Sequence, residues 1–237
     1  MHHQIAFLSD IHGNLTALNA VLADLDRRGI ETVYFLGDVL GRGPAVHEVV
    51  ELVRTRCRAA VYSNWDVGIL NHPHDAGFGS PYYIERVTQE DIAWIRSLPE
   101  RLEFNFCGCS LVAFHGRPSV SFSAAPMFAD AQQNMALCME RFGRHDITVM
   151  GDAHRAFMLV DKGRWLMNTG AVGTPTDGLP CASYLILKHD HGALSSEHVR
   201  VRYDLAQEVS RALRTPGFGH IPDYITEIST GEYTKTY

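Results

Sequence analysis

Three apolar segments in the first 64 residues each end in polar side chains. The segments are QIAFLS (4–9), TVYFLGD (32–38) and AAVYSN (59–64), and the polar residues at or just after their ends are Asp10, His12, Asp38 and Asn64. Leucines at helical spacing over residues 15–28 follow the first segment and stop at Gly29. Alternating strands and helices predict an α/β fold, and ligands bind at the carboxyl edge of its sheet. We therefore expect the four polar residues to converge at that edge.

Asp10 and His12 need a compensating partner if they lie at the end of a buried strand. They stand in the stretch FLSDIHGN, directly after apolar residues. An unpaired buried carboxylate is strongly disfavoured and usually takes up a proton instead. A metal ion is one partner that would keep it charged.

The chain changes its pattern after residue 70. Residues 71–100 predict a rim or lid over the site, with a helix near 91–98. Short strand segments follow at 101–106, 110–116, 147–154, 157–168, 183–188 and 198–204, interrupted by a helix near 127–142. We predict that they form a second, mostly antiparallel sheet packed on the first, within a single domain spanning residues 1–237. We expect the C-terminal GEYTKTY to fray.

Composition and charge exclude several classes of protein. The chain has 237 residues, of which 46% are hydrophobic, and a formal net charge of −6. An acidic chain lacks the positive surface of a duplex nucleic-acid binder. No window of 18 apolar residues and no basic leader with a cleavage site occurs in the sequence, so we expect a cytoplasmic protein without a membrane partner. The sequence does not indicate an oligomeric state.

Seven polar residues that follow apolar strands could ligate metal ions: Asp10, His12, Asp38, Asn64, His115, Asp152 and His154. Oxygen and nitrogen donors of this kind suit manganese, iron or zinc. Two ions could bind if one carboxylate is shared, and Asp38 is best placed to bridge them. For each Asp or Asn alone, a helix cap or turn is the alternative interpretation, and for His115 a hydrogen-bonded core histidine.

The order of the motifs D-x-H, GD, N, H-G and G-x-x-H resembles the calcineurin-like metallophosphoesterase superfamily. The stretches SDIHGNLTALNAVL, YFLGDVLGRGPAVHEVVELVR and NTGAVGTPTDGLPCASYLIL are similar to its small bacterial and archaeal phosphodiesterase branch. This resemblance implies two packed mixed β-sheets flanked by helices. It also implies two divalent ions, with manganese preferred and iron, zinc or nickel as alternatives. The first ion would take Asp10, His12, Asp38 and His154, and the second Asp38, Asn64, His115 and the residue at position 152.

Three residues depart from the family pattern. Asp152 stands where the family usually has a histidine, and Ser63 replaces the glycine before Asn64. A carboxylate at position 152 favours harder ions such as manganese or weakens the second site. Trp65 occupies the place of the histidine that protonates the leaving group in many members. The acid would then be water, Asp66, or one of the loop histidines His72 and His74, whose alternative interpretation is simple solvent exposure.

Candidate substrate contacts are less specific. Arg42, Arg117 and Arg155 each follow a ligand motif and could bind a phosphoryl oxygen, or could be surface charges. Asn14 could cap the first helix, face the substrate, or do both. Phe78, Tyr82 and Tyr83 could stack on a base or pack locally.

The expected function is hydrolysis of a phosphodiester or phosphoanhydride by in-line attack of a metal-bridging hydroxide, with Asp38 as the central catalytic ligand. Small nucleotide diesters and dinucleoside polyphosphates lie within reach of the family. The alternative is a catalytically retired member of the same fold that acts as a binding or scaffold protein. A Rossmann nucleotide-binding motif and a serine nucleophile elbow are missing from the sequence.

Overall fold

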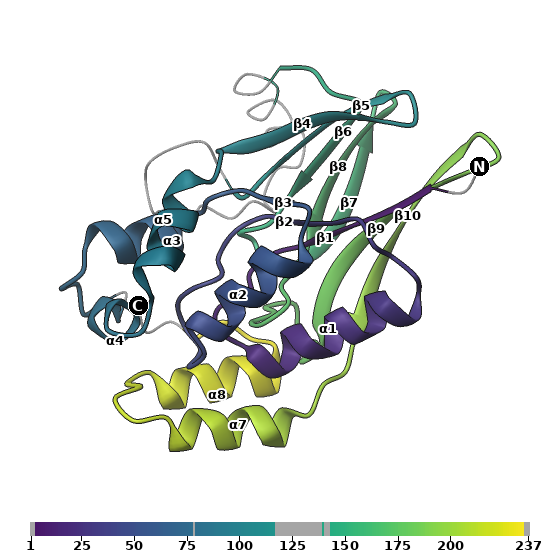
Figure 1. The fold of residues 1–237 in the computed structure, drawn as a ribbon. Helices are drawn as coiled ribbons and strands as arrows, with labels where there is room; N and C mark the ends of the chain where they lie inside the picture. Colours follow the sequence, from purple (N-terminus) through teal and green to yellow (C-terminus); the bar gives the residue numbers. More distant parts are fainter. Residues whose placement is uncertain (1–2, 78, 117–138, 140–142, 235–237) are drawn as a thin grey trace.

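Two five-stranded sheets form the centre of the computed structural model, which describes residues 3–77, 79–116, 139 and 143–234 (Figure 1). The first sheet has the order β10-β9-β1-β2-β3. Its strands are β1 (His3–Leu8), β2 (Val33–Phe35), β3 (Ala59–Ala60), β9 (Ala182–Asp190) and β10 (Ala193–Val201). Strands β1, β2 and β3 are parallel, and β9 pairs antiparallel with β1. The predicted parallel unit at the start of the chain is therefore confirmed.

The second sheet has the order β4-β5-β6-β8-β7. Its strands are β4 (Arg101–Phe106), β5 (Cys109–Phe114), β6 (Ile147–Met150), β7 (Ala156–Asp161) and β8 (Arg164–Thr169). The three central strands run parallel and the two edge strands antiparallel. The sheet is thus mixed, as the family resemblance implies, and the expectation of a mostly antiparallel sheet was wrong. The long connection between β5 and β6 allows the parallel pairing. The helix expected near 127–142 lies outside the described residues, except for position 139.

Strands β9 and β10 were assigned to the wrong sheet by the sequence pattern. The segments SYLILK and HVRVRYD lie in the first sheet, where β9 pairs with β1 in register from His3 with His189 to Phe7 with Leu185. Strand β9 is buried on both faces over its first six residues, because helices cover one face and the second sheet the other. Apolar content predicts such a strand but does not say which of two sheets it joins.

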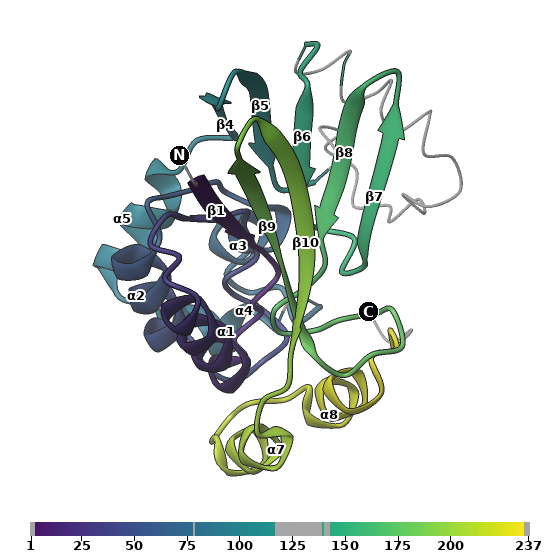
Figure 2. The ribbon, with the colours of Figure 1, turned by 90° about the vertical axis from the view of Figure 1, so that its right-hand side faces the viewer.

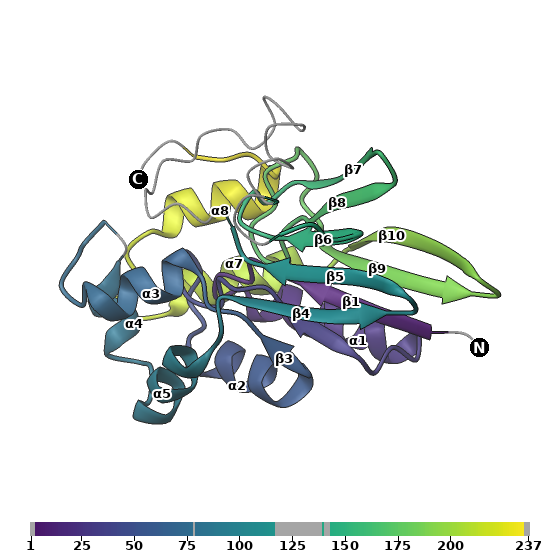
Figure 3. The ribbon, with the colours of Figure 1, turned by 90° about the horizontal axis from the view of Figure 1, so that it is seen from above.

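Helices cover the outer face of the first sheet and the lower end of the fold (Figures 1 and 2). They are α1 (Leu15–Arg27), α2 (His47–Arg56), α3 (Asn64–Asn71), α4 (Ser80–Ile84), α5 (Gln89–Ser97), α7 (Leu205–Arg214) and α8 (Ile221–Thr230). Alternate residues of β1 divide between the two cores: Ala6 and Leu8 pack toward the helices, and Ile5 and Phe7 toward the second sheet. Figure 3 shows the second sheet stacked over the first. No helix in the part of the chain that the structure describes could cross a membrane.

The predicted rim segment is anchored to the loop after β2. Within residues 71–100, the Tyr82 hydroxyl donates to the Pro44 carbonyl at 2.5 Å, and the Tyr83 hydroxyl to Gly43 at 3.2 Å. Both tyrosine side chains are buried in the helical core. Of the two interpretations of these rings, the structure shows local packing, while Phe78 lies outside the described residues.

Candidate metal centre

The polar residues that end the parallel strands meet at the carboxyl edges of both sheets. Asp10 and His12 follow β1, Asp38 follows β2, and Asn64 begins α3 after β3. From the second sheet, His115 follows β5, while Asp152 and His154 follow β6. Seven residues from five separate segments thus reach one region, as expected when strands of two stacked sheets end on the same side.

Four of these residues form the first group: Asp10, His12, Asp38 and His154. All four are buried, and one potential ligand atom from each lies within 4.8 Å of the others. His12 Nε2 lies 3.1 Å from Asp38 Oδ2 and 3.2 Å from His154 Nε2. His154 Nε2 is in turn 3.2 Å from Asp10 Oδ1. Two carboxylates and two imidazoles around one point match the donor set of a transition-metal site.

Three histidines present the same nitrogen to the site. The Nδ1 atoms of His12, His115 and His154 lie 3.0, 2.6 and 2.6 Å from the backbone carbonyls of Leu40, Leu36 and Thr174. A carbonyl can only accept, so each Nδ1 must carry the proton of its hydrogen bond. The Nε2 lone pair is then available to an ion once its own proton has left. Such backbone carbonyls orient the histidine ligands of metal sites.

Within the site, two buried carboxylate oxygens have no hydrogen-bond partner among the described residues: Asp10 Oδ1 and Asp38 Oδ2. Both face histidine Nε2 atoms of the group. A buried oxygen without a donor is costly, and a cation is the partner that both the oxygens and the imidazole nitrogens can share. The residues present therefore fit a divalent metal ion.

Asp38, Asn64, His115 and Asp152 form a second group beside the first. His115 Nε2 lies 2.9 Å from Asn64 Oδ1, 3.4 Å from Asp38 Oδ2 and 3.6 Å from Asp152 Oδ1. Asp38 Oδ2 is therefore shared by the two groups. The Asp152 side chain is 31% exposed, so this group opens to solvent where the first does not.

Burial and neighbouring charges act in opposite directions on the pKa values of the site. Burial would raise the pKa of Asp38, but the nearby His115 and His12 outweigh it and hold that pKa well below its usual range. Burial lowers the pKa of His115, but the Asp38 carboxylate raises it by more, so that the pKa stays well above its usual value. His12 shows the opposite outcome, because burial dominates and lowers its pKa.

Five residues of the two groups have positive φ angles, a backbone conformation that residues other than glycine rarely adopt. The φ angles are 55° at Asp10, 46° at His12, 61° at Asp38, 65° at Asp152 and 55° at His154. Left-handed backbone at residues other than glycine costs free energy and clusters at functional sites. Gly37 nearby has φ 92°, and a Cβ there would lie 2.9 Å from His115 Nδ1. The chain thus turns sharply at each strand end that presents one of these side chains.

Asp66 lies behind the metal groups. Its carboxylate is fully buried and accepts from the backbone N–H groups of residues 38–40, at 2.9 to 3.4 Å, and from the Ser63 hydroxyl at 2.7 Å. Burial, helped by the Asp38 charge, raises its pKa to about 6. The structure therefore places Asp66 as a support for the Asp38 turn.

Asn14 acts as a helix cap. Its Oδ1 accepts from Ala17 N at 3.0 Å at the start of α1. Its Nδ2 donates to the Gly173 carbonyl at 3.0 Å and to Tyr203 Oη at 3.2 Å. Of the two roles predicted from the sequence, the structure shows the cap, and the amide hydrogens point to Gly173 and Tyr203.

The loop histidines and arginines are scattered. His72 caps the C-terminal end of α3 and His74 follows it, and both are exposed. Because α3 has eight residues, His72 lies about 12 Å along the helix axis from Asn64. Arg155 is exposed and donates from Nε to the Thr176 carbonyl at 2.9 Å. Arg117 lies outside the described residues.

Arg42 and Trp65 lie beside the first group. The Trp65 ring packs edge-on against His12, with 5.5 Å between ring centres, and the backbone N–H of Trp65 donates to Asp38 Oδ1 at 3.2 Å. Arg42 is buried and its guanidinium carbon lies 5.3 Å from the centre of the Trp65 ring. The sequence pattern missed the partner of Arg42, which is Glu227 of α8. The apolar spacing of α8 carried no signal for this pair.

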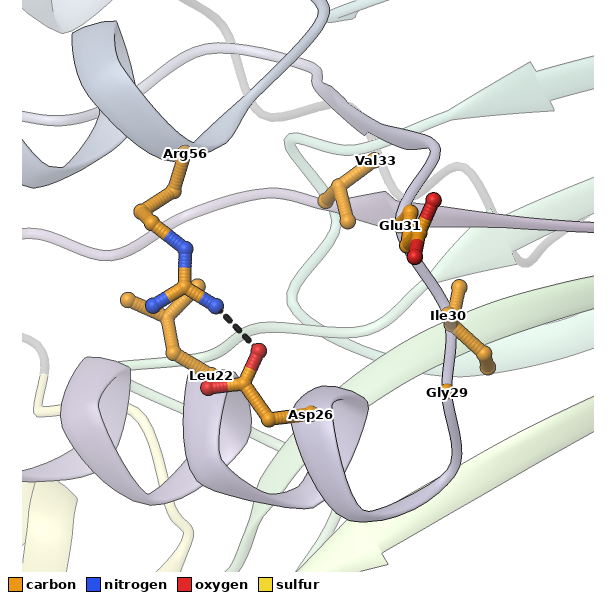
Figure 4. Close-up of a pocket in the computed structure, with 7 residues that line it drawn as sticks. All are labelled: Leu22, Asp26, Gly29, Ile30, Glu31, Val33 and Arg56. Atoms are coloured by element: carbon orange, nitrogen blue, oxygen red, sulfur yellow. Dashed lines mark hydrogen bonds and ion pairs between the residues drawn. The ribbon is translucent and has the colours of Figure 1, made fainter.

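A separate pocket of about 360 Å³ lies at the opposite end of the first sheet (Figure 4). It is lined by residues that end α1, lead into β2 or end α2, and an ion pair joins Arg56 to Asp26 across it. These are the amino ends of the parallel strands, so the pocket is not part of the metal centre.

Comparison with known proteins agrees with this geometry. The model of the calcineurin-like phosphoesterase superfamily domain matches residues 3–225. An uncharacterized protein of Methanocaldococcus jannaschii is 30% identical over 244 residues, covering 94% of this chain and 96% of that protein. The crystal structure of a metallophosphoesterase from Sphaerobacter thermophilus has a TM-score of 0.78 at 27% identity, covering 97% of this chain and 100% of the other. A hypothetical protein from Pyrococcus horikoshii has a TM-score of 0.77 at 20% identity, covering 98% and 99%.

The chain belongs to the calcineurin-like phosphoesterase superfamily. This confirms the resemblance drawn from the sequence motifs, together with the fold of two mixed sheets flanked by helices.

Proposed function

We propose that the chain is a phosphoesterase that uses two divalent metal ions to hydrolyse a phosphodiester or phosphoanhydride. The observation that carries the proposal is the shared atom: Asp38 Oδ2 lies 3.1 Å from His12 Nε2 and 3.4 Å from His115 Nε2, and it has no hydrogen-bond donor among the described residues. A carboxylate oxygen that faces two ligand sets suits a bridge between two ions. Manganese is the preferred ion, since Asp152 adds a hard oxygen donor to the second group.

The ions would supply Lewis acidity and an activated water, and the chain's own residues would do the rest. The first group would hold one ion and the second group the other. Arg42 would bind a phosphoryl oxygen beside the first group, because its guanidinium is buried there and the pKa of His12, lowered mainly by burial, is lowered further by the Arg42 charge. Arg155 and Arg117 stay as further candidates for this contact.

The proton for the leaving group would come from water. Trp65 borders the first group where a proton donor would serve, and Asp66 is engaged with the backbone of residues 38–40. His72 and His74 lie beyond the far end of α3. Substrates whose leaving group is stable as an anion would then react fastest, which suits phosphoanhydrides such as dinucleoside polyphosphates better than nucleotide diesters, whose leaving group is a sugar alkoxide. A flat dependence of the rate on leaving-group basicity across a series of aryl diesters would contradict this assignment.

Metal content and turnover test the proposal together. The chelated protein is reloaded with manganese, iron, nickel or zinc and assayed with bis(p-nitrophenyl) phosphate. We expect two ions per chain and restored turnover, both lost in Asp38→Asn. Asp24→Asn is the matched control: Asp24 is also buried and hydrogen-bonded, to Tyr184 at 2.6 Å, but lies on α1 outside both metal groups. At most one bound ion and no turnover with any metal would favour the alternative, a retired member that acts as a binding or scaffold protein.

Several expectations from the sequence are kept as part of this proposal. They are a single domain over residues 1–237, a cytoplasmic location, a small phosphate-ester or nucleotide substrate, and no duplex nucleic-acid or membrane partner. The family match over residues 3–225 supports the first and the third.

A further inference from the structure

The last described residues of the chain hold the Arg42 side chain. Arg42 Nη1 donates to Glu227 Oε2 at 2.7 Å, and Glu227 Oε1 accepts from the Thr234 hydroxyl at 2.9 Å and the Thr234 N–H at 3.3 Å. The guanidinium carbon lies 5.1 Å from the centre of the Tyr233 ring. Fraying was expected over residues 231–237, of which 235–237 lie outside the described residues. Within the described part, Glu227 binds Thr234 and Arg42 packs on Tyr233, which corrects the expectation for residues 231–234.

Holding a guanidinium at this place is electrostatically unfavourable in two ways. Arg42 is buried, and it lies beside residues that fit cations. Glu227 is fully buried as well and offsets the charge of Arg42. A buried ion pair is a weak source of stability compared with a well-packed apolar pair. We therefore look for the role of this ion pair in the orientation of the Arg42 side chain rather than in the stability of the fold.

The surroundings restrict that direction. Arg42 itself has a left-handed backbone with φ 59°, and the rings of Trp65 and Tyr233 both contact its guanidinium. Trp65 also packs against His12, so one aromatic wall runs from Arg42 to the first metal group. Glu227 meets the guanidinium at Nη1. Cation–π contacts and one charged hydrogen bond together fix the plane of a guanidinium.

We propose that Glu227, Tyr233 and Thr234 form a C-terminal clamp that aims Arg42 at a phosphoryl oxygen of the substrate, so that α8 and the two residues at 233–234 complete the substrate site. The clamp residues are positioning residues that act through Arg42. The proposal rests on the phosphoesterase function proposed above. It adds that affinity for the phosphoryl group depends on residues beyond α8.

Glu227→Gln and Glu208→Gln provide a matched pair for the test. Glu208 of α7 is also fully buried and accepts from Thr16 Oγ1 at 2.5 Å and Tyr224 Oη at 2.9 Å, but it does not touch Arg42. Each substitution keeps the shape of the side chain and weakens a buried contact of the C-terminal helices. Both variants are loaded with manganese and compared with wild type in kcat, KM, bound metal, melting temperature and the dissociation constant of inorganic phosphate.

We expect Glu227→Gln to raise KM and the phosphate dissociation constant about tenfold, with a smaller change in kcat and unchanged metal content. Glu208→Gln should lower the melting temperature without changing KM or phosphate affinity. The inference is overturned if Glu227→Gln behaves like Glu208→Gln, with lower thermal stability and unchanged phosphate binding.

Tyr233→Ala and Thr234→Val keep the proposal testable if Glu227→Gln does not fold. Each removes one contact of the clamp at a less buried position, and each should weaken phosphate binding about threefold. Unchanged phosphate affinity in both would overturn the clamp. Wild-type protein without turnover under any metal would instead refute the proposed function, and the phosphate dissociation constants would still decide whether the clamp acts on Arg42.

Discussion

The two halves of the metal centre differ in how firmly they are built. The first group is closed: its four residues are buried, and both of its histidines are anchored to backbone carbonyls. The second group shares Asp38 and an equally anchored His115, but its Asp152 is partly exposed. Asp38 is thus shared between one group of residues that is buried and one that opens to solvent. We therefore expect one tightly held ion and one that exchanges.

Removal of one equivalent histidine from each half should have the largest effect. His12 and His115 both bind a backbone carbonyl through Nδ1 and face Asp38 Oδ2 through Nε2. We expect His12→Ala to abolish tight metal binding and lower kcat/KM roughly 1000-fold, which corresponds to about 4 kcal/mol. His115→Ala should keep one tight ion and lose about 100-fold. Metal analysis after dialysis and steady-state kinetics measure both, and equal metal loss in the two variants would contradict the asymmetry.

Asp66 offers a test that affects both halves at once. Its carboxylate accepts from the backbone N–H groups that set the turn at Asp38. In Asp66→Asn, the N–H₂ group of the new amide would face one of these backbone N–H groups, and two donors cannot hydrogen-bond to each other. We expect the affinity for both ions to fall about 10- to 100-fold. Asp91→Asn is the control, because Asp91 is a buried carboxylate at the same position of α5 that does not contact the site. If Asp66 were the general acid, the variant would keep its ions and lose the basic limb of the pH–rate profile.

The metal-free and the metal-bound protein should differ in how their thermal stability depends on pH. In the metal-free protein, neighbouring carboxylates raise the pKa of His115 and His154 against the opposing effect of burial. A raised histidine pKa contributes stability that is full below about 6.5 and is lost as the pH rises through the folded-state pKa. The melting temperature of the chelated protein should therefore fall as the pH rises above about 6.5.

The loaded protein should show the opposite slope over the same range. Metal binding must displace the extra protons of His115 and His154, so affinity should rise about tenfold per pH unit for each proton released. Differential scanning fluorimetry with chelator or with manganese measures both slopes. Parallel slopes in the two conditions would mean that the histidines do not exchange protons for metal.

Of these substitutions, Asp152→His should have the smallest effect, a change in the metal preference of the second group. The residue is partly exposed and belongs to the second group alone, so folding should be little changed. A neutral imidazole in place of a carboxylate should move the preference of the second ion from manganese toward zinc by about tenfold. Competition between the two metals at fixed pH measures the shift, while the first ion serves as the internal reference. An equal shift in both ions would show that the two halves are not independent.

The strand ends were the most predictable part of the site. Asp10, His12 and Asp38 follow apolar segments, and the rule for parallel strands places such residues at one edge. The partners of these residues could not be predicted, because a hydrogen bond such as that from Arg42 to Glu227 joins residues 185 positions apart and depends on how α8 packs. The same limit applies to Asp66, which the sequence offered as a possible acid, because its contact with the backbone at Leu40 depends on how α3 packs against the turn after β2.

The sheets show a similar division. Local patterns predicted the existence of most strands, and the structure divides the predicted segment 157–168 into β7 and β8, joined by a turn at Lys162 and Gly163. The choice of sheet for β9 and β10 is a long-range packing decision, which strand composition does not encode. The helices α7 and α8 escaped prediction, yet α8 supplies Glu227 to the site.

The backbone is left-handed, and therefore unfavourable, at five residues of the two groups: Asp10, His12, Asp38, Asp152 and His154. Each such residue destabilises the fold by about 1 kcal/mol or more relative to a relaxed conformation or a glycine. Glycine at any of these five positions should therefore raise the free energy of unfolding while it removes one side chain from the group. Stability and the completeness of the site are opposed at the same five positions.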